Sequence, residues 1–326
     1  MPTVICQSPA FRSVRALLLR YARSDAQVLI EGETGTGKEL AAREIHYSSP
    51  RRDQPFVPVN CGAMQDGLIE NELFGHSRGA FTDAREAQVG LVEHARGGTL
   101  FLDEIDSLSH KAQVTLLRFL QDNEYRPIGG TVRTSGARII AATNCHLGQL
   151  VLDGGFRSDL LYRLNVLYVH LPPLRERDGD VALLAEHFLT AATQRMQGQL
   201  RRWSGDALQA LSAYAWPGNV RELENVVLRV CTLADGETID LEELLAAEPA
   251  IGGSWRRSHG GQPYAGVSFR HAKARVIETF EQDYLTRLLQ QTRGNVTDAA
   301  RLAGKERRAL GKLLKKHQIN RPSYRP

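Results

Sequence analysis

Short apolar runs alternate with helix-like stretches through the first half of the chain. The runs that we expect to form strands are residues 28–30, 56–59, 100–102, 138–142 and 166–170, and a representative helical stretch is 113–120. Strands that alternate with helices in this way build a parallel sheet lying between helices. The pattern therefore predicts an α/β subdomain over residues 1–172.

The strand pattern stops after Leu171-Pro172-Pro173-Leu174. Helical spacing then covers residues 181–196, 204–214 and 220–234, which predicts a smaller helical lid over residues 173–247. Residues 248–267 contain Pro249, two glycine pairs and Pro263 without periodicity, so we expect a flexible linker there. A separate C-terminal domain should occupy residues 268–326.

The most informative motif follows the first predicted strand and leads into a helix-like stretch. Its residues are Gly32, Glu33, Thr34, Gly35, Thr36, Gly37, Lys38 and Glu39. Glycines allow the backbone N–H groups and the helix N-terminus to point at phosphate oxygens, and the lysine adds a positive charge for the terminal phosphates. The motif predicts a nucleoside triphosphate site between sheet and lid, although alone it could be a glycine-rich turn before a surface helix.

A second motif supports the first. Residues 97–104 read as an apolar strand that ends in Asp103-Glu104, at the sheet edge where α/β proteins bind ligands. We expect Asp103 to hold Mg²⁺ and Glu104 to polarise water, which favours hydrolysis. Glu39 stands where this loop normally carries a Ser or Thr ligand for Mg²⁺, so the metal would depend on Asp103, phosphates and water.

The amino-acid composition indicates which class of protein this is. The chain has 326 residues, of which 42% are hydrophobic and 24% charged, as in a soluble globular protein of two or three domains. Its four cysteines are scattered and show no metal-ligand spacing, which fits a reducing cytoplasm. Since no apolar run is long enough to cross a bilayer, we expect a cytoplasmic protein without a membrane partner.

The positive charge is concentrated at the C-terminal end. Residues 268–326 hold 14 Lys and Arg against 5 Asp and Glu, a formal charge of +9, so the rest of the chain carries −5 within the total of +4. Such asymmetry favours a polyanion partner, because cations that neutralise phosphates release bound counterions. A solvated helical face is the alternative.

The pattern of the basic region predicts a helix-turn-helix. Residues 294–304 form a short helix that closes at Gly304, and 306–317 form a second helix rich in cations. An amphipathic helix precedes them, and we expect it to pack within the domain or against a second copy; its apolar residues are Phe269, Ala272, Val276, Phe280, Tyr284 and Leu288. The cations placed to contact double-stranded DNA are Arg307, Arg308, Lys312, Lys315 and Lys316.

Within this set, we expect Arg307 and Arg308, in the first turn of the second helix, to read bases. Lys315 and Lys316 are expected to contact the phosphate backbone.

Six segments of the chain form a set of motifs with a defined order and spacing: residues 72–76, 79–84, 97–104, 156–164, 171–177 and 216–223. Through these segments the chain resembles, from about residue 8 to 320, the AAA+ bacterial enhancer-binding proteins that activate sigma-54 RNA polymerase. The tail is similar to the Fis-type DNA-binding domain usual in these activators. The resemblance implies an AAA+ P-loop NTPase sheet with a helical lid, followed by an all-α Fis-type helix-turn-helix domain.

The resemblance also implies roles for residues around the triphosphate. Asn60 matches the switch partner that restrains Glu104, and Thr143-Asn144 match the sensor that reads the γ-phosphate. Arg221 looks like the lid residue that touches the nucleotide of its own subunit. By residue type alone, the two asparagines could instead cap the helices that follow them.

Arg157 and Arg163 look like the arginine fingers that reach the ATP of a neighbouring subunit. This implies a homo-oligomeric ring, expected to be a hexamer, in which assembly switches hydrolysis on. Surface salt bridges with Asp159 or Glu222 are the alternative for these two arginines and for Arg221.

Residues 79–84 resemble the family's GAFTGA loop, whose Phe and Thr engage sigma-54. Here the loop reads GAFTDA, with Phe81 and Thr82 present and Asp83 in place of a glycine. The substitution removes backbone freedom and adds a negative charge near the tip. Asp tolerates left-handed backbone conformations better than most residues, so the loop can still form.

We therefore expect an ATP-driven transcription activator that binds enhancer DNA, assembles into a ring and remodels sigma-54 RNA polymerase to open promoters. Almost nothing precedes the AAA+ region, so we expect no N-terminal regulatory domain and control by a regulator in trans or by expression. The main alternative is an AAA+ DNA-binding regulator that does not act through sigma-54, marked by Asp83. A different AAA+ remodeller, such as a helicase loader, is disfavoured by the GAFT segment and the Fis-like tail.

Overall fold

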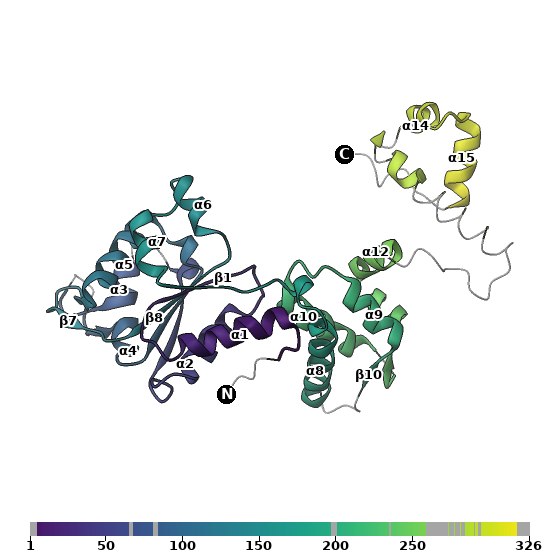
Figure 1. The fold of residues 1–326 in the computed structure, drawn as a ribbon. Coiled ribbons are helices and arrows are strands. Elements are labelled where there is room, and N and C mark those ends of the chain that lie inside the picture. The colour runs from purple at the N-terminus through teal and green to yellow at the C-terminus, as the bar shows by residue number, and fades with distance from the viewer. Residues whose placement is uncertain are drawn as a thin grey trace. The chain divides into compact units, whose positions relative to one another are not determined.

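The computed structural model divides into two compact units, residues 1–255 and 256–326, shown in Figure 1. It describes residues 5–64, 68–80, 84–196, 201–234, 236–258, 273, 277, 281, 284–289, 291–292 and 295–317. In these parts of the chain, none of the helices has the length and apolar character needed to cross a membrane.

Five parallel strands form the central sheet of the first unit, in the order β2-β5-β8-β1-β9. This order places β1 between β8 and β9, so that Ile30 lies opposite both Ala142 and Val169. All five predicted strands are confirmed. They are β1 (Val28–Glu31), β2 (Phe56–Asn60), β5 (Thr99–Asp103), β8 (Arg138–Thr143) and β9 (Leu167–His170).

Successive residues of the inner strands β1, β5 and β8 enter two different cores. Leu100 and Leu102 of β5 face the core that includes α3 to α7, whereas Phe101 faces the core formed with α1 and α2. A sheet buried on both faces requires apolar residues at consecutive positions, which explains the apolar runs in the sequence. The helices are α1 (Pro9–Tyr21), α2 (Lys38–Tyr47), α3 (Ile69–Phe74), α4 (Leu91–His94), α5 (His110–Asp122), α6 (Leu147–Leu152) and α7 (Ser158–Leu164).

Short elements extend the edge of this subdomain. Two small hairpins pair β3 (Gly75–His76) with β4 (Gln88–Val89) and β6 (Glu124–Tyr125) with β7 (Arg133–Thr134). Single 3-10 turns follow β2, β5 and β9, namely η1 (Cys61–Ala63), η2 (Ile105–Ser107) and η3 (Leu174–Glu176).

The lid has a core of its own, which centres on Trp216. This side chain is fully buried, and its indole Nε1 donates to the Leu211 carbonyl at 2.8 Å. The three predicted lid helices are confirmed, with ends shifted by one residue. The lid contains α8 (Asp180–Arg195), α9 (Gly205–Ala213), α10 (Asn219–Leu233), α11 (Leu241–Ala247) and the pair β10 (Arg202–Trp203) and β11 (Thr238–Ile239).

The predicted linker needs a correction in its first part, because residues Pro249–Ser258 form helix α12. Proline at the first helical position has a backbone angle already suited to a helix. Ile251 is fully buried in the lid core, and tertiary packing of this kind overrides the weak helix propensity of the two glycines that follow it.

The second unit contains the predicted helix-turn-helix. Helix α14 (Val296–Leu302) begins at Asn295, whose side chain caps it, and Gly304 takes a left-handed φ of 59° before α15 (Arg307–Lys316). Leu310 and Leu314 of α15 pack with Leu285 and Leu289. Of the preceding amphipathic helix, Tyr284 and Leu288 are described as helical; Phe269, Ala272, Val276 and Phe280 lie outside the described residues.

A buried carboxylate ties the N-terminal segment to the lid. Asp180, the first residue of α8, accepts hydrogen bonds from the backbone nitrogens of Gln7 at 2.6 Å and Ser8 at 2.8 Å, and from the Ser8 hydroxyl at 3.0 Å. The side chain is fully buried. Since α1 begins at the next residue, Asp180 fixes where α1 starts relative to the lid.

Replacing Asp180 with Ala should lower the free energy of unfolding by about 2–4 kcal/mol, because it leaves these donors without an acceptor. Chemical denaturation would measure the loss. Asp178 is exposed and supplies the matched control, for which the change should stay within about 0.5 kcal/mol. Equal effects at the two positions would contradict the assigned role.

Candidate nucleotide-binding site

Backbone carbonyls of the phosphate loop bind the side chain of Lys38. Gly35 and Gly37 have left-handed φ angles of 79° and 99°, which favour glycine, and the loop leads directly into α2. Lys38 is the first residue of α2, and its Nζ donates to the carbonyls of Gly32 at 2.7 Å and Glu33 at 3.2 Å. Burial lowers the pKa of Lys38. The loop thus holds one largely buried ammonium at the C-terminal edge of the sheet.

Two carboxylates end β5 beside this lysine. Asp103 Oδ1 accepts from the Glu104 backbone nitrogen at 3.0 Å, and Glu104 takes a left-handed φ of 55°. Burial raises the pKa of Asp103, and the nearby Lys38 charge acts in the opposite direction. Among the described residues, no group of three His, Cys, Asp or Glu side chains forms a metal cage. Asp103 as the one carboxylate ligand would suit Mg²⁺, which keeps waters and binds substrate phosphates.

Asn60 and Glu104 meet at a glycine. The Asn60 Oδ1 accepts from the backbone nitrogens of Gly62 at 2.8 Å and Ala63 at 3.2 Å, so it caps η1 as the alternative interpretation expected. A Cβ at Gly62 would lie 2.7 Å from the Glu104 Oε2 and 3.2 Å from the Asn60 Oδ1. The side chains of Asn60 and Glu104 therefore both lie beside Gly62, in space that a side chain at this position would fill. The switch role of Asn60 stays a prediction.

The predicted sensor joins the loop to the carboxylate side of the site. The Thr143 carbonyl accepts from the Gly32 nitrogen at 3.2 Å, and its hydroxyl donates to the Asp106 Oδ1 at 2.8 Å. Asn144 follows it and is exposed. The end of β8 therefore contacts both the phosphate loop and the turn after Glu104.

One turn of the lid holds the phosphate loop. Asn219 is fully buried with a left-handed φ of 54°, and its Nδ2 donates to the Glu33 Oε2 at 3.1 Å and the Thr34 carbonyl at 3.0 Å. Its Oδ1 accepts from the Leu174 nitrogen at 2.8 Å. Arg175 donates to both Glu33 carboxylate oxygens, at 2.9 and 2.6 Å. The contacts with Arg175 and then Asn219 lower the pKa of Glu33 to about 2.

The predicted lid sensor lies at the same contact. A Cβ on Gly35 would lie 2.2 Å from the Gly218 carbonyl and 3.2 Å from the Arg221 Cβ, so the loop and the first turn of α10 touch. The Val220 nitrogen donates to the Gly35 carbonyl at 3.0 Å. No role was predicted for Arg175 or Asn219, although both lie in segments that carry the family resemblance.

The predicted arginine fingers make other contacts within this single chain. Arg157 pairs with the exposed Asp159 at 3.0 and 2.7 Å, which is the salt bridge named as the alternative. Arg163 donates to the carbonyls of Leu120 at 2.9 Å and Gln121 at 3.2 Å. The other alternative partner, Glu222, accepts from the Gly218 nitrogen at 2.7 Å.

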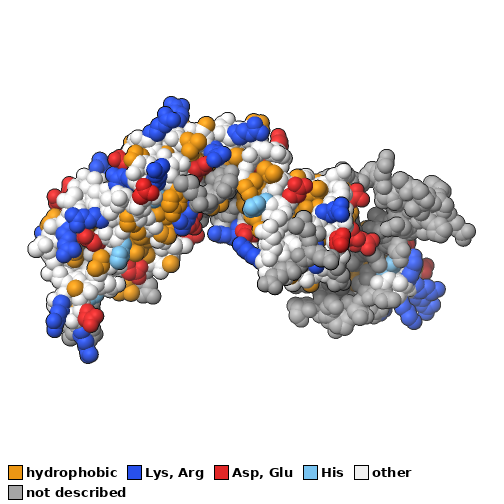
Figure 2. All heavy atoms as spheres, turned by 90° about the horizontal axis from the view of Figure 1, so that it is seen from below, with side chains coloured by type: hydrophobic (Ala, Val, Ile, Leu, Met, Phe, Trp, Pro, Cys, Tyr) orange, Lys and Arg blue, Asp and Glu red, His pale blue; other side chains and the backbone are white. Residues whose placement is uncertain are grey.

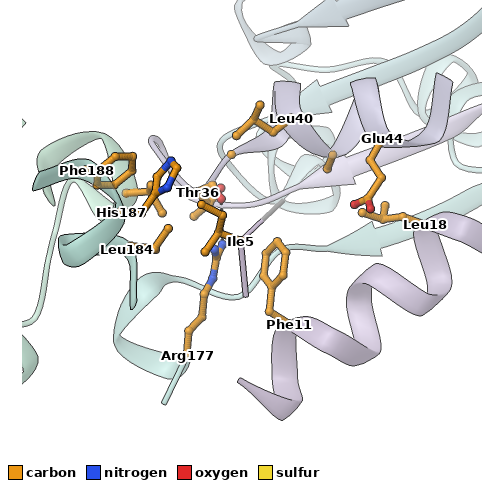
Figure 3. Close-up of a pocket in the computed structure, with 13 residues that line it drawn as sticks. Ile5, Phe11, Leu18, Thr36, Leu40, Glu44, Arg177, Leu184, His187 and Phe188 are labelled. Carbon is orange, nitrogen blue, oxygen red and sulfur yellow. Dashed lines mark hydrogen bonds between the residues drawn. The ribbon is translucent and has the colours of Figure 1, made fainter. Parts of the chain in front are cut away.

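A cavity of about 150 Å³ adjoins the phosphate loop (Figure 3). Thr36 and Gly37 form part of its wall, together with apolar side chains of α1, α2 and the lid helix α8. Such residues cannot be told from ordinary core positions in a sequence, so the pocket was not predicted. Its lining residues are Ile5, Phe11, Leu18, Thr36, Gly37, Leu40, Ala41, Glu44, Arg177, Leu184, His187, Phe188 and Val220.

The base of the GAFTDA loop is closed by a hydrogen bond from the Gly79 nitrogen to the Ala84 carbonyl at 2.8 Å. Gly79 has a left-handed φ of 79°. Phe81, Thr82 and Asp83 lie outside the described residues. The predicted contact with sigma-54 therefore stays a prediction.

In the second unit, α15 has an apolar and a basic side. Leu310 and Leu314 are buried, whereas Arg307, Arg308, Lys312 and Lys315 are exposed. Lys and Arg side chains stand together at the right of Figure 2, on the described part of this unit. Lys316 forms an ion pair with Glu281 at 2.8 Å and therefore already has an anionic partner. The individual DNA contacts stay predictions.

Known sequence families match most of the chain. The family described as "Sigma-54 interaction domain" matches residues 4–170, "AAA+ ATPase lid domain" matches 175–250, and "Bacterial regulatory protein, Fis family" matches 276–317.

The chain is also similar to named proteins. It is 41% identical to transcriptional regulatory protein GlrR of Escherichia coli, over 99% of this chain and 69% of that protein. It is 42% identical to regulatory protein AtoC of Escherichia coli, over 97% of this chain and 68% of that protein. The crystal structure of NtrX from Brucella abortus in complex with ATP superposes with a TM-score of 0.71 and 32% identity, covering 98% of this chain and 70% of that chain.

Replacing Asn219 with Ala should lower the free energy of unfolding by about 3 kcal/mol. The buried groups that bond to Asn219 lose their partner, and alanine tolerates the left-handed backbone conformation of this position poorly. Chemical denaturation would measure the change.

Asn219→Gly is the matched variant, since it loses the same hydrogen bonds but removes the strain of the left-handed backbone conformation. It should be more stable than Asn219→Ala by about 1 kcal/mol. An Ala variant as stable as the unsubstituted protein would show that the lid does not depend on this side chain.

Proposed function

We propose, since the chain belongs to the sigma-54-dependent activator family, that it hydrolyses ATP in a ring of identical subunits and uses the energy to open promoters held by sigma-54 RNA polymerase. The observation that carries the proposal is the assembly around Lys38: a glycine loop after β1, two carboxylates at the end of β5, which β8 separates from β1, and a lid turn that contacts the loop. No part of this assembly is needed for DNA binding alone.

ATP would bind with its phosphates on the loop and its base in the adjoining apolar pocket. The NtrX crystal structure in complex with ATP, which covers 98% of this chain, supports this choice of nucleotide. Lys38 would release its two backbone carbonyls and take phosphate oxygens instead, which favours its charged form against the effect of burial.

Asp103 is the residue that would hold Mg²⁺, and the metal, when bound, would neutralise charge on the phosphates. Glu104 would orient the attacking water. Its left-handed backbone turns its carboxylate toward Gly62, where a larger residue would collide with it. Asn60 lies at the same point and would position Glu104, while Thr143 would report the state of the γ-phosphate to Asp106.

Hydrolysis would require a second subunit. Arg157 is exposed and its partner Asp159 is exposed too, and an ion pair of this kind costs little to break. Arg163 is held by two carbonyls of α5 and would keep its place on the surface. We propose that both arginines reach the ATP of a neighbour in a ring, which we expect to be hexameric.

Two surfaces of the protein would bind its partners in transcription. Phe81 and Thr82 would engage sigma-54 from the loop closed at Gly79 and Ala84. The exposed cations of α15 would bind enhancer DNA, with Lys316 contributing least because Glu281 already neutralises it.

A mixing experiment tests the shared site. Arg157→Ala and Glu104→Gln should each lower the ATPase rate by about 10³-fold or more when alone. Mixed in equal amounts, they should recover about a quarter of the original rate, because a random ring pairs an intact finger with an intact carboxylate at about that fraction of interfaces.

The control mixture is Glu104→Gln with Lys38→Ala. Both residues act on the nucleotide of their own subunit, so no interface in the mixture is complete and no activity should return. If the Arg157→Ala mixture also stays inactive, the finger does not act between subunits.

A further inference from the structure

The pocket beside the phosphate loop contains a carboxylate with one unused oxygen. Glu44 of α2 lines the pocket, and its Oε1 accepts from the Arg15 Nε at 2.6 Å. The Oε2 is buried and has no hydrogen-bond partner among the described residues. The Glu44 side chain is 9% exposed. A buried acceptor left unpaired is unfavourable, so this oxygen is suited to a ligand that brings a donor.

The other polar groups of the wall do not supply that donor. Arg177 is the buried cation of the pocket, and its guanidinium donates to the carbonyls of Pro172 and Thr36, both at 2.8 Å. The same group lies over the Phe11 ring at 4.0 Å. Figure 3 shows Arg177 entering from the side of Phe11 and Ile5, whereas Glu44 reaches down from α2 beside Leu18.

The position of Glu44 fits the far end of a nucleotide. Leu40 and Glu44 lie one turn apart on the same face of α2, and Glu44 is about 10 Å along the helix from Gly37. With phosphates on the loop, a ribose and a purine span this distance. Phe11, Leu40 and Ala41 supply apolar surface between them, as the faces of a base require, and the acceptor lies at the end where the edge of the base would arrive.

We propose that the Glu44 Oε2 accepts a hydrogen bond from the exocyclic 6-amino group of adenine and thereby selects adenine nucleotides. The inference rests on the proposed use of ATP. A 6-oxo purine would place an acceptor against this oxygen, and a purine without a 6-substituent would leave it unpaired. Both should bind more weakly, because a site built to accept a hydrogen bond rejects ligands that cannot donate it.

Equilibrium binding of the full chain to ATP, GTP and purine riboside triphosphate, which lacks only the amino group, tests the proposal. ATP should bind about tenfold or more tightly than purine riboside triphosphate, as expected for a hydrogen bond to a charged acceptor. Glu44→Met keeps the length of the side chain without an acceptor and should bring this ratio to about one. Glu44→Gln keeps one acceptor and should give an intermediate ratio.

Arg15→Gln is the matched control. It breaks the same ion pair but leaves the Glu44 carboxylate in place, so the preference for ATP should persist. Equal binding of ATP and purine riboside triphosphate by the unsubstituted protein would overturn the inference while leaving the ATPase proposal intact. Tighter binding of GTP would show that the carboxylate reads the guanine N1–H and 2-amino group instead. Failure to bind any of the three would count against the proposed function itself.

Discussion

Asn219 is a buried side chain of the lid that, together with Arg175 and Arg177, holds the phosphate loop. Its amide bonds to Glu33 and Thr34 on the loop and to Leu174 at the start of the lid, and it is fully buried. Because Trp216 anchors the same turn in the lid core, this turn joins the loop to the body of the lid. The conformation that surrounds Lys38 therefore depends on where the lid lies, which links nucleotide binding to lid position.

The strand order completes the site. Since β8 lies between β5 and β1, Thr143 ends between the strand that carries the carboxylates and the strand that leads into the loop. Its backbone bonds to Gly32 and its hydroxyl to Asp106, so one residue touches both sides. A parallel sheet brings such strand ends to one edge, and this is why residues far apart in sequence form a single site.

Local patterns predicted most of this structure. The five strands, the glycine loop and the helix-turn-helix each depend on neighbours in sequence, and all were predicted. Helix α12 was missed, because the buried Ile251 outweighs the glycines beside it. The contact between Glu33 and Arg175 and the pocket around Phe188 also escaped prediction. These features depend on packing between distant segments, which residue types do not reveal.

The proposed function requires that nucleotide hydrolysis in this chain acts on sigma-54. Size-exclusion chromatography of the protein with sigma-54, with and without ADP–aluminium fluoride as a mimic of the hydrolysis transition state, tests it most directly. We expect the two proteins to elute together only when the mimic is present, despite Asp83 in the loop. If the protein assembles and hydrolyses ATP while sigma-54 elutes separately, hydrolysis does not act on sigma-54.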